Sequence, residues 1–342
     1  MPILDERTLR LPFPTCSSPF AEAAEVHVRQ WARRFEMVRG PESERRFAET
    51  GFGICAGYVQ ADASSAALNV YAKWLAWLFL VNDQHGEGVY ETPETWLGAV
   101  RHLRPVFETG EVDNGSASTP AARALADVLG HVYPVMSPAW RKRFSRHCWE
   151  TIEAVVPESD RRRRERVPGV DEYISNRRLV SAGIPLFDLC EFMAGRELPD
   201  DVREHPAYRE MVMAASEVMA WCNDVASLEK EEAAGEVDNF VLVLEVAEGL
   251  DRSRAVEAVV ERVRHRVEEY LLAERSINTY LASRAPNFET WRVVDYCIRS
   301  MRHWMVGNVR WSQLNPRYTV SQSHRQRSRP PHVVDLLSTR AG

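Results

Sequence analysis

Apolar positions along the chain recur mostly at steps of three and four residues, the spacing of one face of an α-helix. Residues 64–81 differ because they are apolar nearly throughout, with one lysine and no glycine or proline, and they predict a largely buried helix. No segment alternates apolar and polar residues between hairpin turns, so we predict an all-α fold. The other segments that predict helices are 21–36, 140–155, 171–193, 207–232, 236–249, 253–283 and 287–312.

One of these segments contains residues that interrupt helices. Gly183 and Pro185 fall inside 171–193, where they should break or kink the helix. No linker separates the helices into two groups. We therefore predict one large helical domain over residues 1–318, followed by a polar, mobile tail over residues 319–342.

Two stretches between the helices are polar and predict loops. Residues 107–120 are rich in Gly, Ser, Thr and acidic residues. Residues 156–169 carry the basic run Arg161–Arg164 between two prolines. A short basic run beside acidic residues is usually solvated, so we expect these arginines on an exposed loop.

The composition is that of a folded soluble protein. Apolar residues make up 45% and charged residues 27% of the 342, and the net charge is 43 − 49 = −6. This mild acidity argues against a nucleic-acid partner, and no stretch reaches the ~18 uncharged apolar residues of a membrane span. Met1–Arg10 has no apolar signal-peptide core, so we expect a cytoplasmic protein. The six cysteines form no C-x-x-C pair and are expected to be buried free thiols.

Three oxygen-bearing residues share one face of the helix predicted over 207–232. Asn223, Ser227 and Glu231 stand at i, i+4 and i+8, which spreads them over only about 80° of the helix circumference. Amide, hydroxyl and carboxylate oxygens suit a hard cation such as Mg²⁺, and the adjacent Lys230 could meet an anion held by the same cation. The alternative is an ordinary exposed polar face.

A second polar cluster follows the apolar helix that we predict to end at Val81. It contains Asn82, Asp83 and Glu87. Negative charge at a helix C-terminus is unfavourable by a few tenths to ~1 kcal/mol, and a bound cation would explain its presence. The alternative is a plain helix exit with Gly86 or Gly88 as its stop.

A basic residue precedes the predicted helix break by about one turn. Arg178 is followed by Ser181 and Ala182, immediately before Gly183. A helix break frees backbone carbonyls, which can stabilise a nearby positive centre. The alternative is a surface arginine in front of a packing kink.

The last predicted helix carries an aromatic stripe. Trp304, Asn308 and Trp311 fall on one face, and Arg317 and Tyr318 follow the helix end. An arginine and a hydroxyl at that position could grip a phosphate. The alternative is a core-facing tryptophan stripe with a chain-end turn.

The order of these four features resembles that of the bacterial class I terpene synthases, over roughly Leu11 to Tyr318. The family's downstream metal motif, Asn-Asp-x-x-Ser-x-x-Lys-Glu, is matched in full from Asn223 to Glu231. Two positions depart from the family pattern. Asn82 stands where an acidic motif usually begins with Asp-Asp, and Ser181 stands where Asp or Thr is commoner.

The resemblance implies a single large helical bundle around a central apolar cavity. Three Mg²⁺ ions, with Mn²⁺ as an alternative, would hold the diphosphate of a linear isoprenoid, whose carbon–oxygen bond ionises before the cation cyclises. Arg178 would bind the diphosphate and so sense its presence. Ser181 and Ala182 would occupy the two positions that follow this arginine at the helix break, which the family calls the linker and the effector, and the effector would contribute a backbone carbonyl. The implied metal ligands are Asn223, Ser227 and Glu231 for one ion and Asn82, Asp83 and Glu87 for the other two, and the further diphosphate contacts are Lys230, Arg317 and Tyr318.

Aromatic faces stabilise cations in a dry pocket, and two aromatic residues are well placed to do so. Phe79 lies one turn before the acidic motif, and Trp304 begins the aromatic stripe. The alternatives are an inactive isoprenoid-binding protein of the same fold and a chain-elongating prenyltransferase, which would need a second Asp-rich motif. A homodimer remains open.

Substrate length depends on pocket depth. Small residues expected near the cavity, Gly53, Ala56, Gly57 and Ala182, favour geranylgeranyl diphosphate slightly over farnesyl diphosphate.

Overall fold

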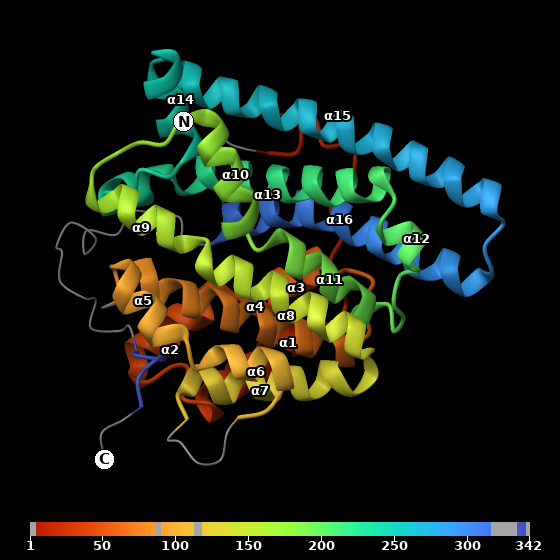
Figure 1. Ribbon diagram of the computed structural model, residues 1–342, viewed down its shortest axis with the longest axis horizontal. Helices are drawn as coiled ribbons and strands as arrows, with labels where there is room; N and C mark the ends of the chain where they lie inside the picture. The colour runs from red at the N-terminus through yellow and green to blue at the C-terminus, as the bar shows by residue number, and fades with distance from the viewer. Residues whose placement is uncertain (1–4, 87–89, 113–117, 316–333, 340–342) are drawn as a thin grey trace.

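The computed structural model describes residues 5–86, 90–112, 118–315 and 334–339, and this part of the chain is helical with no strand (Figure 1). Its longer helices are α1 (Ala21–Arg34), α2 (Gly40–Thr50), α4 (Ser65–Gly86), α7 (Pro120–Val132), α8 (Pro138–Glu153), α10 (Val170–Val180), α11 (Gly183–Met193), α13 (Pro206–Ala234), α15 (Arg252–Arg284) and α16 (Phe288–Leu314). The shorter ones are α3 (Phe52–Val59), α5 (Pro93–Val100), α6 (Leu103–Thr109), η1 (Tyr133–Val135), α9 (Val155–Arg163), α12 (Asp200–Arg203) and α14 (Phe240–Glu248).

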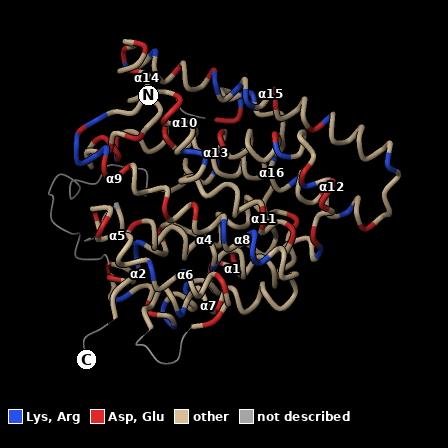
Figure 2. The backbone as a smooth tube through the Cα atoms, in the orientation of Figure 1, with Lys and Arg blue, Asp and Glu red and all other residues tan. Residues whose placement is uncertain are grey.

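The helices pack around α4, α11, α13 and α16. Helix α15 lies along α13 on one side of the molecule, and α1 packs on α3 and α4 on the other (Figure 1). Acidic and basic residues are interspersed over the outer helices such as α15 (Figure 2). None of the described helices has the length and apolar character required to cross a membrane.

Helix α4 confirms the buried helix predicted over 64–81, because Trp74, Leu75 and Trp77 are fully buried. The predicted end was wrong. The helix continues to Gly86, so that Asn82 and Asp83 lie in its last turns instead of after it.

The predicted break within 171–193 is confirmed. Helix α10 ends at Val180, and α11 begins at Gly183 after Ala182 adopts a left-handed conformation with φ 57°. Gly183 is required here because a Cβ atom would lie 2.3 Å from the Ser216 hydroxyl oxygen of α13. The close approach of α11 to α13 therefore fixes the position of the break.

The predicted loop 156–169 was wrong over its first half, which forms α9. Arg161 is 3% exposed and pairs with Asp238 at 2.5 Å, and Arg162 pairs with Glu236. Half of the basic run is thus neutralised by carboxylates that lie far away in sequence, which a local charge pattern does not reveal.

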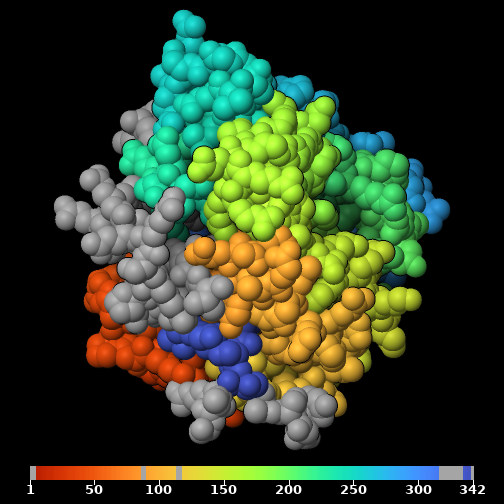
Figure 3. Space-filling view, turned by 60° about the vertical axis from the view of Figure 1, so that its left-hand side comes forward, coloured from red at the N-terminus to blue at the C-terminus, as the bar shows by residue number. Residues whose placement is uncertain are grey.

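The tail predicted to be mobile over 319–342 contains an ordered part. Leu336 and Leu337 are buried in the core. The Leu336 N–H donates to the Gln84 side-chain oxygen at 3.1 Å, and the Ala121 N–H donates to the Leu336 carbonyl at 3.1 Å. Figure 3 shows the segment 334–339, in dark blue, lying against the N-terminal half of the chain.

Candidate active site

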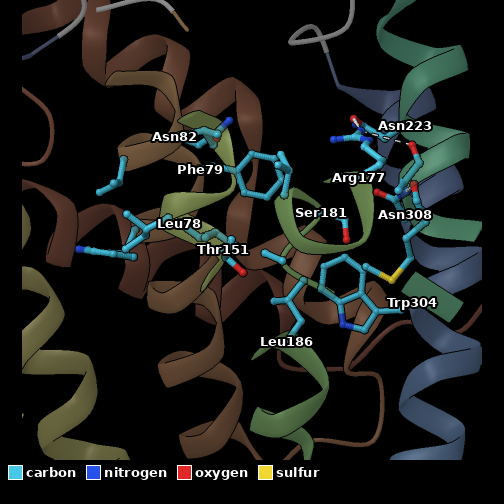
Figure 4. A pocket seen from close by; sticks show the side chains of 18 of the residues that line it. Leu78, Phe79, Asn82, Thr151, Arg177, Ser181, Leu186, Asn223, Trp304 and Asn308 are labelled. Carbon is cyan, nitrogen blue, oxygen red and sulfur yellow. Dashed lines mark hydrogen bonds between the residues drawn. The ribbon is translucent and has the colours of Figure 1, made fainter. Parts of the chain in front are cut away.

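A pocket lies between α4, α8, α10, α11, α13 and α16, at the break between α10 and α11 (Figure 4). Its cavity volume is about 160 Å³. Its lining is mostly apolar, with a few polar side chains, as small-molecule sites usually are. The lining residues used below are Leu78, Phe79, Asn82, Arg177, Ser181, Ala182, Leu186, Asn223, Trp304 and Asn308.

Aromatic side chains form much of the wall. Trp304 comes from α16 and Phe79 from α4, and both line the pocket as the sequence predicts. The Phe79 ring packs against Phe52 with centroids 5.7 Å apart and edge-on against Trp311 at 5.5 Å. These contacts hold the ring in place at the pocket wall.

The polar residues of the pocket come from separate helices. Asn82 lies on α4, Arg177 on α10 and Asn223 on α13, so the two predicted metal motifs both reach this pocket (Figure 4). Ser181 and Ala182 line it at the helix break. The Ser181 hydroxyl donates to the Arg178 carbonyl at 3.1 Å and accepts from the Gly183 N–H at 3.3 Å, which stabilises the break.

Among the described arginines, Arg177 lines the pocket. One guanidinium nitrogen, Nη2, donates to Asp224 Oδ1 at 2.6 Å and to Asn223 Oδ1 at 3.1 Å. Its Nε is buried without a hydrogen-bond partner among the described residues. A buried, unsatisfied N–H is costly, and rotation of the Arg177 side chain towards an anionic ligand in the pocket would give this N–H an acceptor.

Asp224 is completely buried behind this arginine. Burial raises the pKa of its carboxyl to about 6, while the positive charge of Arg177 lowers it. Asp224 also accepts from the Tyr173 hydroxyl and from the Phe240 N–H at 3.1 Å. The ion pair and these two hydrogen bonds hold the carboxyl in place, so that it anchors Arg177.

The structure places Arg178, the predicted diphosphate sensor, outside the pocket. Its Nε donates to Glu217 at 2.5 Å, and it does not line the cavity. Adjacent residues on a helix point about 100° apart, so only one of two consecutive arginines can face the site. The sequence held a clue, because Arg177 is four residues before Ser181 and shares its helix face more closely than Arg178 does.

Asn223, Ser227 and Glu231 lie on α13 as predicted. The Ser227 hydroxyl donates to Glu231 Oε1 at 2.7 Å, and the Asn239 side chain donates to Glu231 Oε2 at 2.8 Å. These bonds bring the oxygens of Ser227 and Glu231 together, one and two turns from Asn223. Such an all-oxygen donor set fits a hard divalent cation.

The remaining predicted site residues lie outside the pocket or outside the described part of the chain. Asp83 and Lys230 are partly exposed and do not line the pocket. Glu87, Arg317 and Tyr318 lie outside the described residues. In the described part of the chain, no group of three or more His, Cys, Asp or Glu residues is arranged to hold a metal, so any cation site here depends on Asn and Ser oxygens as well.

The chain is similar to known proteins over most of its length. A family model described as terpene synthase family 2, C-terminal metal binding, matches residues 73–269. Epi-isozizaene synthase of Streptomyces coelicolor is 31% identical over 95% of this chain and 92% of its own length. The (-)-beta-caryophyllene synthase ((2E,6E)-farnesyl diphosphate cyclizing) of Saccharothrix espanaensis is 29% identical over 97% and 94%. The structure of wild-type cucumene synthase superposes with a TM-score of 0.77 and 26% identity, covering 89% of this chain and 99% of that one.

Proposed function

Because the chain belongs to the bacterial class I terpene synthases, which are lyases acting on prenyl diphosphates, we propose that it converts farnesyl diphosphate into a cyclic terpene and releases diphosphate. The observation that carries this proposal is the pocket itself. Aromatic and aliphatic side chains line it, and Asn82, Arg177 and Asn223 reach it from three different helices. Apolar walls suit the hydrocarbon chain, and the polar groups suit the diphosphate.

The donor oxygens define which residues would hold metal ions. Asn223, Ser227 and Glu231 would hold one divalent cation, and Asn82 with Asp83 would hold others, with Mg²⁺ favoured and Mn²⁺ as the alternative. When bound, such cations neutralise the diphosphate and make it a better leaving group. Asn82 brings a neutral ligand to the α4 side of the pocket, and Asp83 beside it would have to turn towards the pocket to add a negative charge.

Arg177 binds the diphosphate in this proposal, in place of Arg178. Its guanidinium would donate a charge-assisted hydrogen bond to a diphosphate oxygen, and the Nη2 bond to Asp224 tethers the side chain beside the pocket. Negative charge that develops on the leaving group is stabilised by this preorganised donor.

The walls protect the carbocation that forms when the carbon–oxygen bond breaks. Trp304 and Phe79 offer ring faces, which stabilise a desolvated cation by about 2 kcal/mol or more. The break at Ser181 and Ala182 adds backbone carbonyl dipoles beside the same cavity. The apolar lining keeps water away from the reacting carbons.

The pocket favours fifteen carbons over the twenty that the sequence slightly favoured. Gly53 and Gly57 do not line it; a Cβ atom at either would collide with α1, so both serve helix packing. Ala56 does not line it either, and only Ala182 of the four small residues does. A cavity of about 160 Å³ is close to the engineered 150 Å³ cavity that holds benzene, so either chain requires the pocket to expand, and the fifteen-carbon chain requires the smaller expansion. The Saccharothrix relative, named for cyclising farnesyl diphosphate, supports the same choice.

Incubation of the purified protein with the ten-, fifteen- and twenty-carbon diphosphates tests this proposal. We expect a cyclic fifteen-carbon product by mass spectrometry that appears with Mg²⁺ and disappears with EDTA. A twenty-carbon product would overturn the substrate assignment. Thermal stabilisation by Mg²⁺ and inorganic diphosphate without any product would instead support an inactive binding protein.

A further inference from the structure

The Trp304 indole is held by a side chain instead of by the backbone. Its Nε1–H donates to the Tyr71 hydroxyl at 2.8 Å, and both residues are almost completely buried. By contrast, Trp77 and Trp96 line the same pocket and donate to backbone carbonyls, those of Ala121 and Ile152. The orientation of Trp304 therefore depends on a single hydroxyl that substitution can remove.

Tyr71 connects three helices behind the pocket wall. It lies on α4, accepts from Trp304 on α16, and donates to the Leu186 carbonyl of α11 at 3.5 Å. Burial raises the pKa of Tyr71 well above its usual value, so its hydroxyl stays neutral and can accept and donate at once. Tyr71 itself does not line the pocket, whereas Trp304 and Leu186 do.

We propose that Tyr71 is a positioning residue that sets the angle of the Trp304 ring and thereby selects the products of cyclisation. Cation–π attraction depends on the ring face that the cation meets, so rotation of Trp304 changes which cation is stabilised. Without Tyr71, the buried indole N–H must turn towards another acceptor or recruit a water molecule. Either response changes the product ratio, and a recruited water would also add alcohol products. This inference rests on the proposed function.

The test compares the products of wild-type protein and Tyr71→Phe with farnesyl diphosphate and Mg²⁺. We expect KM to stay within about threefold of the wild-type value, because the diphosphate contacts are intact. The ratio of the principal product to the others should fall by about threefold or more, since small differences in barrier height decide that ratio.

Tyr270→Phe is the matched control. Its buried hydroxyl donates to the Ile298 carbonyl at 3.1 Å, and it does not line the pocket. Both variants lose one buried hydroxyl, but only Tyr71→Phe should change the products. Unchanged products in an active Tyr71→Phe protein would overturn this inference alone, whereas an inactive wild-type protein would overturn the proposed function and the inference with it.

A double variant covers the case in which Tyr71→Phe does not fold. Trp304→Phe removes the indole N–H, so that adding Tyr71→Phe leaves no unsatisfied donor at this position. The double variant should then give the products of Trp304→Phe alone. A further change in products would show that Tyr71 acts independently of Trp304 and would overturn the inference.

Discussion

Arg177 and Asp224 form an ion pair at 2.6 Å that joins α10 to α13 beside the pocket. Asp224 is entirely buried, and its neighbour Asn223 accepts from the same guanidinium nitrogen. The pair therefore links the helix break to the helix that carries Asn223, Ser227 and Glu231. A ligand that forms a hydrogen bond with Arg177 would therefore also change the hydrogen bond between Arg177 and the amide oxygen of Asn223.

Arg177→Lys should lower kcat/KM with farnesyl diphosphate by about 100-fold, equivalent to about 3 kcal/mol of transition-state stabilisation. Lysine keeps the charge that Asp224 requires but lacks the Nε donor and the planar geometry of arginine. Arg178→Lys is the matched control and should change kcat/KM less than about threefold, because Arg178 pairs with Glu217 outside the pocket. The opposite ranking in steady-state kinetics would restore Arg178 as the diphosphate residue.

This pair of arginines illustrates what the sequence can predict. The spacing of apolar and polar residues within a helix is a local property of the sequence. It was therefore enough to predict the helix break and the single helix that carries Asn223, Ser227 and Glu231. The rotation of a helix about its own axis is harder to predict from the sequence, since an error of one residue turns the inferred face by about 100°. The residue that faces the pocket depends on how α10 packs, which the sequence pattern does not specify.

Long-range pairing explains the other errors. The Arg161–Arg164 run resembles a solvated loop until Asp238 and Glu236, more than seventy residues away, are brought beside it. Because Gly53 is small, the sequence suggested that it leaves space for substrate. In the structure its lack of a side chain instead allows α3 to approach the backbone of α1, a contact that no local sequence pattern reveals.

Glu231→Gln should reduce turnover by about 100-fold or more, because an amide is a weaker ligand for a divalent cation than a carboxylate. Glu229→Gln, on an exposed position of the same helix, is the control and should keep near wild-type turnover. The effect of Mg²⁺ with inorganic diphosphate on the melting temperature provides a second measurement. Equal stabilisation of wild-type protein and Glu231→Gln would argue against a ligand role.

Asn82→Asp should retain or raise activity and lower the Mg²⁺ concentration required for half-maximal turnover. A second negative charge on the last turns of α4 strengthens cation binding, and Asn82 already lines the pocket. Turnover measured over a series of Mg²⁺ concentrations checks this expectation. A folded but inactive Asn82→Asp protein would show that the amide itself is required.

Leu336→Ala should lower the free energy of unfolding by about 2–4 kcal/mol, because it leaves a cavity beneath the segment 334–339. Leu336 is 1% exposed, and its backbone holds Gln84 near the end of α4. Thr339→Ala shortens an exposed side chain of the same segment and should change stability by less than about 0.5 kcal/mol. Urea unfolding distinguishes the two, and equal midpoints would mean that the segment contributes no stability.

Gly53→Ala should destabilise the protein by at least about 3 kcal/mol, because the added methyl group meets backbone that cannot move independently. Its Cβ atom would lie 2.1 Å from the Glu25 nitrogen and 2.3 Å from the Glu25 Cα atom, so α3 must separate from α1. Gly130→Ala, on an exposed position of α7 with nothing within 4 Å, should instead stabilise by about 0.5–1 kcal/mol. Thermal unfolding of both variants measures the contrast. A stable Gly53→Ala protein that accepts a shorter substrate than the wild type would instead place Gly53 at the cavity wall and overturn its packing role.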